Sequence, residues 1–160
     1  LAYGDSGRPP VIPSNATLTF EIEALDVTAP PKPPEPMEFP KLDSLTLTTN
    51  PSGLKWADIR VGTGPEIKAG NSADMHYSGW LENGSKFDAS VDRGETFPVE
   101  NIGNAGVIKG WNEGLQRMKP GGVCRFVIPA KLAYGDRGAG ELIGPDATLV
   151  FYVELISVTP

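Results

Sequence analysis

The chain repeats one stretch of its own sequence, and this repeat constrains its fold more than any other feature. Residues 1–28, LAYGDSGRPPVIPSNATLTFEIEALDVT, align without a gap on residues 132–159, LAYGDRGAGELIGPDATLVFYVELISVT, with fourteen of 28 positions identical. Ungapped similarity at this level indicates a duplicated structural unit. Because nothing before residue 1 corresponds to residues 51–131, we expect one complete unit preceded by the C-terminal remnant of another.

The sequence between the two copies predicts the domain boundaries. Residues 29–52 begin with APPKPPEP, a proline-dense run that favours extended polyproline conformation. We interpret 1–28 as the remnant, 29–52 as a Pro-rich linker and 53–160 as the complete domain. Pro30 and Pro33 also have the PxxP spacing of signalling-domain ligands. The alternation in LTLTT at 45–49 predicts a short strand.

Charge and cysteine content exclude several classes of protein. The chain has 20 acidic and 14 basic residues and a net charge of -6, which disfavours binding to nucleic acid or anionic membranes. Cys124 is the only cysteine, so no intrachain disulfide can form. No apolar run approaches the roughly 20 residues that span a bilayer. The chain does not begin with methionine, so we expect a truncated N-terminus and leave the compartment open.

Alternation and turn signals predict several strands in the complete unit. Residues 53–64 predict a strand, and residues 147–158 predict a long strand rich in β-branched and aromatic side chains. Residues 71–90 predict a hairpin whose turn lies at 82–85, because Asn83 and Gly84 tolerate positive φ.

One helix and one further strand complete the predicted fold. Residues 107–118 have helical spacing with one apolar face, made by Ile108, Trp111, Leu115 and Met118, and the helix should end at 119–122. The strand at 123–129 alternates, and we predict inward-facing Val123, Arg125 and Val127, opposite Cys124, Phe126 and Ile128. One helix packed against antiparallel strands is an α+β arrangement.

Three blocks in the complete unit resemble a known family. HYSGWLENGSKFDAS, VIKGWNEGL and AYGDRGAG…ATLVFYVEL, in this order and spacing, resemble the FKBP family of tacrolimus-binding peptidyl-prolyl cis-trans isomerases. The resemblance covers about 110 residues. It implies an FKBP-like antiparallel twisted β-sheet wrapped around one short α-helix, in a fragment of a tandem-domain member.

The resemblance also implies an activity, the isomerisation of X–Pro bonds in protein substrates to assist folding. The barrier to this rotation is about 20 kcal/mol, because the amide loses resonance as it twists. A dry aromatic pocket favours the twisted, less polar amide, so the reaction needs no covalent step, no metal and no cofactor. The expected partners are proline-containing polypeptides and inhibitors of the tacrolimus and rapamycin type.

The site residues follow from the same resemblance. It implies catalytic roles for Tyr77, Phe87, Asp88, Trp111, Tyr134 and Phe151. It implies substrate binding by Arg93, Phe97, Val107, Ile108, Leu142 and Ile143. Trp111 would lie under the proline ring, while the Ile108 N–H and the Tyr134 hydroxyl would bond the substrate backbone. Asp88 would be a buried carboxylate linked to Arg93, and Leu142 and Ile143 would lie on a loop over the site.

Each of these residues also has a purely structural interpretation. The aromatic side chains would also suit an ordinary core, and Asp88 would suit a turn. We predict that His76 points away from Tyr77 and is not catalytic, and that Cys124 is a packing residue. Gly144 stands where many members have proline, so the loop over the pocket should be looser.

Two further functional classes stay open at this point, a non-catalytic peptide-binding module and an assembly role for the duplicated segment. Residues 17–24, TLTFEIEA, alternate like a half-buried strand that has no sheet of its own. We expect residues 1–27 to be ordered only through contact with another surface, most simply a second chain. Self-association through residues 1–27 is therefore one expected outcome.

Overall fold

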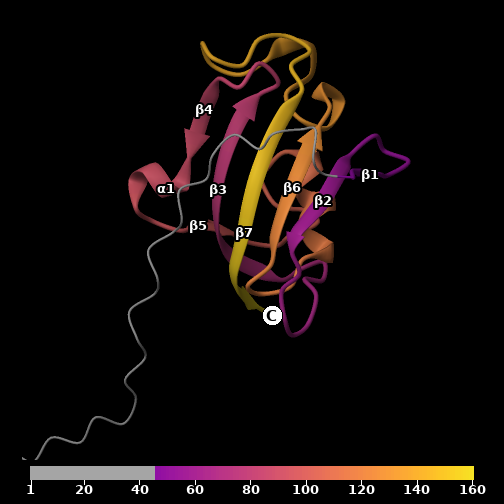
Figure 1. The fold of residues 1–160 in the computed structure, drawn as a ribbon, viewed down its shortest axis with the longest axis vertical. Helices are drawn as coiled ribbons and strands as arrows, with labels where there is room; N and C mark the ends of the chain where they lie inside the picture. The colour runs from indigo at the N-terminus through magenta and orange to yellow at the C-terminus, as the bar shows by residue number, and fades with distance from the viewer. Residues whose placement is uncertain (1–45) are drawn as a thin grey trace, which may run out of the picture. The chain divides into compact units, whose positions relative to one another are not determined.

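The fold is built on one antiparallel sheet of seven strands, and the computed structural model describes residues 46–160 of the chain. The strands are β1 (Thr48–Thr49), β2 (Lys55–Arg60), β3 (Ser72–Leu81), β4 (Lys86–Ala89), β5 (Phe97–Val99), β6 (Val123–Ile128) and β7 (Leu149–Thr159). Their hydrogen-bonded order is β1-β2-β6-β7-β3-β4, and β5 also pairs with β3. The longest strand, β7, therefore lies between β3 and β6 (Figure 1).

The helical elements are short. They are α1 (Ser90–Arg93), α2 (Lys109–Gly114) and the 3-10 turns η3 (Leu115–Arg117), η4 (Ala130–Leu132) and η5 (Gly135–Arg137). Two glycines let α2 lie directly on β6: a Cβ at Gly110 would be 2.5 Å from Ile128 Cγ2, and one at Gly114 would be 2.7 Å from Phe126 Cε1. Within residues 46–160, no helix has the length and apolar character needed to cross a membrane.

The structure confirms the predicted α+β class and most of the predicted elements. The hairpin at 71–90 is formed by β3 and β4, and the Leu81 N–H donates to Ser85 O at 2.9 Å across its turn. Gly84 has a φ of 87°, in the left-handed region that favours glycine. The predicted helix is α2 continued by η3, with Trp111 and Leu115 buried in the core.

The predicted orientation of β6 is wrong. Its side chains alternate as expected, but Cys124, Phe126 and Ile128 belong to the core cluster under α2, while Val123 and Val127 do not. Arg125 therefore lies on the opposite face of the sheet. The pattern could not distinguish the two faces because every residue of β6 is buried. A strand covered on both sides gives no contrast between inward and outward positions.

The sheet begins before residue 53. Thr48 pairs with Trp56, and the side chains of Asn50 and Ser52 donate hydrogen bonds of 2.6 Å and 2.7 Å to Glu113 in α2. The last residues of the predicted linker, 48–52, are thus tied to the domain. The rest of the predicted linker and the predicted remnant at 1–28 lie outside the described residues.

Candidate functional site

A cavity of about 520 Å³ opens between α2, β7 and the strands β3 to β5. Its lining combines five aromatic side chains of the sheet and α2 with apolar and polar residues of the adjoining segments. The lining residues are Tyr77, Phe87, Asp88, Phe97, Gly106, Val107, Ile108, Lys109, Trp111, Ala133, Tyr134 and Phe151. The cavity falls in the size range of small-molecule and peptide side-chain sites.

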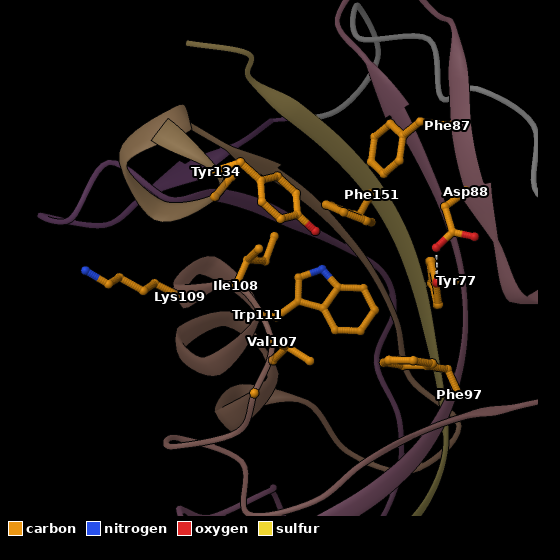
Figure 2. A pocket seen from close by; sticks show the side chains of 12 residues that line it. Tyr77, Phe87, Asp88, Phe97, Val107, Ile108, Lys109, Trp111, Tyr134 and Phe151 are labelled. Carbon is orange, nitrogen blue, oxygen red and sulfur yellow. Dashed lines mark hydrogen bonds between the residues drawn. The ribbon is translucent and has the colours of Figure 1, made fainter. Parts of the chain in front are cut away.

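Trp111 forms the centre of the aromatic lining. Its ring meets Tyr77 at 5.1 Å and 84°, and Phe151 at 5.3 Å and 78°, between ring centroids. Phe97 meets the same ring at 5.9 Å and 84°. These are edge-to-face arrangements, which the aromatic quadrupole favours. Figure 2 shows the indole as the floor of the pocket, with the other rings standing around it.

Phe87 completes the wall because β3 has a glycine behind it. Phe87 and Phe151 meet edge-to-face at 5.5 Å. A Cβ on Gly79 would lie 2.6 Å from Phe87 Cζ and 2.8 Å from Phe151 Cε1. Any larger residue at position 79 would therefore push both rings into the pocket.

Tyr77, Asp88 and Arg93 form a hydrogen-bonded triad at the edge of the cavity. The Tyr77 hydroxyl donates to Asp88 Oδ2. Arg93 donates to Asp88 Oδ1 at 2.6 Å and to the Tyr77 hydroxyl oxygen at 3.1 Å. Burial and the bond to Asp88 raise the pKa of Tyr77 to about 12. Burial works to raise the pKa of Asp88, but the bonds from Tyr77 and Arg93 outweigh it and hold that pKa below its usual value.

The predicted pairing of Asp88 with Arg93 is present, but the carboxylate is not buried. The side chain of Asp88 is 42% exposed and that of Arg93 is 49% exposed. Asp88 lies at the end of β4, immediately before α1, where the chain leaves the sheet. The triad therefore borders the pocket at its solvent side, and its ion pair is weakened by water.

Asn112 holds the rim that carries Val107 and Ile108, and the sequence patterns gave no sign of it. Its Oδ1 accepts from the backbone N–H groups of Gly103 at 2.8 Å and Ala105 at 3.0 Å. Its Nδ2 donates to the carbonyls of Ala105 at 3.0 Å and Val107 at 3.2 Å. One amide thus satisfies four backbone groups of an irregular loop. The available sequence signal was a polar residue in the first turn of the helix, whose side chain can bond the backbone of the preceding loop.

Tyr134 is one of the exposed polar residues that line the pocket. Its side chain is 44% exposed, and Figure 2 shows its hydroxyl pointing inward above Trp111. Ile108 precedes α2, where the first backbone N–H groups of a helix lack intrahelical acceptors. Among the described residues, the Tyr134 hydroxyl and the Ile108 N–H are two candidate donors to a bound backbone, and the buried Trp111 Nε1–H, which has no hydrogen-bond partner, is a third.

Most of the predicted site residues meet at this cavity, and three do not line it. Arg93 lies behind Asp88 as its partner. Ile143 is buried in the core and pairs with Ala139 in a small bridge, while Leu142 is 63% exposed beside it. The structure adds Gly106, Lys109 and Ala133 to the lining. The catalytic role of the first set of residues and the substrate-binding role of the second set remain predictions.

His76 and Cys124 have structural partners. His76 Nδ1 lies 3.2 Å from the Ser90 hydroxyl, on the face opposite Tyr77. The Cys124 thiol is fully buried and donates to the Ala57 carbonyl at 3.3 Å. Burial raises the pKa of this thiol to about 12, which keeps it protonated and unreactive.

The family model and the relatives that resemble this chain belong to the same family. The sequence profile of the FKBP-type peptidyl-prolyl cis-trans isomerases matches residues 64–156. An FK506-binding protein of Neisseria meningitidis serogroup B is 47% identical over 106 residues, which are 66% of this chain and 96% of that protein. FK506-binding protein 1 of Saccharomyces cerevisiae is 52% identical over 91 residues, 57% of this chain and 79% of that protein.

Solved structures agree. The crystal structure of AtFKBP13 superposes with a TM-score of 0.66 at 41% identity, over 71% of this chain and 99% of that one. The crystal structure of FkpA from Escherichia coli gives a TM-score of 0.66 at 40% identity, over 71% of this chain and 52% of that one.

Proposed function

The chain belongs to the FKBP-type peptidyl-prolyl cis-trans isomerases, and from this membership we propose that the cavity around Trp111 is where it rotates X–Pro bonds. The observation that carries the proposal is the closed set of edge-to-face rings. It encloses a space with an apolar floor and with donors on one side. Such a space suits a proline ring with its preceding amide.

The pocket lowers the barrier by binding the twisted amide more tightly than the planar one. A planar amide is strongly polar because of resonance, and twisting reduces this polarity. An apolar site therefore loses less solvation energy on binding the twisted state. Phe87 and Phe151 keep water away from the reacting bond, and Trp111 packs under the ring.

Two donors orient the substrate backbone in this proposal, the Ile108 N–H and the Tyr134 hydroxyl. Both residues line the cavity, and Figure 2 shows their side chains close to Trp111. The Tyr77–Asp88–Arg93 triad acts at a distance from the bond, by fixing the Tyr77 ring as a wall. This mechanism has no step in which a side chain accepts or donates a proton.

The same cavity is the proposed site for macrolides of the FK506 type. Relatives of this chain are named for binding FK506. Such ligands present an apolar ring and carbonyl acceptors, which match the floor and the donors here. We therefore propose competition between FK506 and proline-containing peptides.

The decisive test is a protease-coupled assay of cis-to-trans exchange in X–Pro peptides. Wild-type protein should accelerate the exchange, and FK506 should abolish the acceleration. Phe87→Ala should lower kcat/KM at least tenfold, because water then reaches the amide. Ile156→Ala removes a large side chain of β7 that is 42% exposed and not part of the cavity, and it should keep the wild-type rate.

Two outcomes would reject the site. One is equal rates for wild type and Phe87→Ala, with both proteins shown to be folded by circular dichroism. The other is full FK506 sensitivity in a Trp111→Ala variant.

A further inference from the structure

The outer face of the sheet, opposite α2, is as buried as the core. Cross-strand pairing places Trp80 beside Val150, and Val150 beside Val127. The next row holds Ser78, Tyr152, Arg125 and Ala57. We call these seven side chains the outer-face cluster. Their exposed fractions, apart from that of the half-buried Tyr152, are Ala57 6%, Ser78 1%, Trp80 3%, Arg125 0%, Val127 8% and Val150 0%.

This burial does not come from the main core. Ala57, Trp80, Val127 and Val150 are buried hydrophobics that lie outside the core cluster. Within residues 46–160, α2 and η3 pack on the inner face, through Trp111 and Leu115. Successive side chains of a strand point to opposite faces, so the outer-face cluster points away from both elements.

Arg125 shows what kind of cover this face requires. Its side chain is fully buried, and none of its Nε, Nη1 and Nη2 atoms has a hydrogen-bond partner among the described residues. A buried charge without a partner is strongly unfavourable. Glu154, in the next row of the same face, is already paired with Arg60 at 2.6 Å. The cover must therefore bring an acceptor, and a carboxylate is the strongest partner for a guanidinium.

We propose that residues 33–45 of the same chain cover the outer-face cluster and that a carboxylate in this segment pairs with Arg125. The segment reads PPEPMEFPKLDSL and lies outside the described residues. It alternates apolar side chains, Met37, Phe39 and Leu42, with acidic ones, Glu35, Glu38 and Asp43. This composition matches a face of hydrophobic side chains around one buried cation.

The position of β1 makes the segment long enough. Because β1 is antiparallel to β2 and Thr48 pairs with Trp56, the chain before Thr48 runs toward Ala57 of the cluster. The strand order puts β3 four strand spacings from β1, or about 20 Å. Thirteen residues in extended polyproline form reach roughly 40 Å. So short a tether gives the segment a high effective concentration at this face, which favours it over a second copy.

The test is a double-mutant cycle in the full-length chain, followed by urea unfolding. Glu35→Gln, Glu38→Gln and Asp43→Asn are combined, with and without Arg125→Met. When Arg125 is present, the triple change should raise the equilibrium constant for unfolding about tenfold, because charged hydrogen bonds that stabilise the native state are lost. In the Arg125→Met background, where no buried cation is left, the same triple change should alter the equilibrium constant for unfolding much less.

A matched triple change provides the control. Glu21→Gln, Glu23→Gln and Asp26→Asn remove the same charge from residues outside 33–45. They should have the same effect in both backgrounds. Coupling of Arg125 to the control set alone, or to neither set, would overturn the proposal.

Hydroxyl-radical labelling with mass spectrometry gives a second readout that needs no Arg125 variant. Trp80 and Val127 should be protected in wild type to the same degree at low and high protein concentration. Phe39→Asp should expose both, while the inner-face Phe126 stays protected. Protection that grows with concentration would identify a second copy as the cover. Strong labelling of Trp80 in wild type would show an open face that awaits another partner, and either result would reject residues 33–45.

Discussion

Tyr77 joins the two chemical parts of the site in one side chain. Its ring packs edge-to-face on Trp111 and Phe97, while its hydroxyl donates to Asp88 at the solvent side. The sequence resemblance placed Tyr77, Asp88 and Arg93 in one site, and the structure brings them together. The solvent exposure of Asp88 and Arg93 could not be predicted from the sequence, because it depends on where the chain leaves β4.

The raised pKa of Tyr77 predicts a loss of stability in alkali. The folded-state pKa of about 12 exceeds the ordinary tyrosine pKa of 10.0, so the fold favours the protonated hydroxyl. The stabilisation is complete below pH 10.0 and is lost as the pH rises toward 12. In urea unfolding at rising pH, wild type should lose about 2 kcal/mol more than Tyr77→Phe, which has no hydroxyl to ionise. Parallel curves for the two proteins would contradict the prediction.

Tyr134 predicts a smaller catalytic effect than the aromatic walls. Tyr134→Phe keeps the ring and removes one hydrogen bond to the substrate, which is worth about 1 kcal/mol, or about fivefold in kcat/KM. The hydroxyl is at the exposed side of the pocket, so the fold should not change. The peptide assay measures the effect, with Tyr152→Phe on the outer face as control. A fall as large as that of Phe87→Ala would show that Tyr134 does more than orient the backbone.

At the scale of elements, β3 leaves room for the aromatic wall of the cavity because one of its residues has no side chain. Gly79 lies behind Phe87 and Phe151, and α2 lies close on β6 for a similar reason at Gly110 and Gly114. Hydrophobic periodicity and the Asn83-Gly84 turn were enough to predict the hairpin and α2. Periodicity could not predict the orientation of β6, because a strand buried on both faces has no polar side.

Gly79→Ala should damage both activity and stability. The new methyl would lie 2.6 Å from Phe87 Cζ, so the Phe87 ring must move into the space that the substrate occupies. Overpacking of this kind costs about 1–3 kcal/mol. Thermal unfolding and the peptide assay should both report the change.

Gly144→Ala is the matched control for stability. No atom lies within 4 Å of its added Cβ, and its φ is not in the left-handed region. It should raise the free energy of unfolding by about 0.4–1 kcal/mol, because alanine has less freedom in the unfolded chain. If Gly79→Ala unfolds like Gly144→Ala, the crowding at Phe87 is not real.

At the scale of the whole molecule, the repeat relates the first residues of the chain to β7. Leu149, Phe151 and Val153 are inner-face residues of β7, and the first copy carries Leu18, Phe20 and Ile22 at the aligned positions. We propose that residues 1–28 are the end of a preceding FKBP-like repeat, joined by a Pro-rich linker to the complete domain. The sequence of this segment has the apolar alternation of a central strand.

Removal of residues 1–32 separates the isomerase from this segment. Every described residue that lines the cavity lies in the range from Tyr77 to Phe151, so kcat/KM for X–Pro peptides should stay at the full-length value. An apolar strand with unpaired edges tends to pair with another chain, so the full chain should associate as its concentration rises, and the shortened chain should not. Sedimentation velocity over a range of concentrations measures this. Residues 33–45 are retained, so the cover proposed for the outer face is not disturbed. Association that persists after the deletion would assign it to the domain itself, and a loss of activity would show that the first copy supports the catalytic fold.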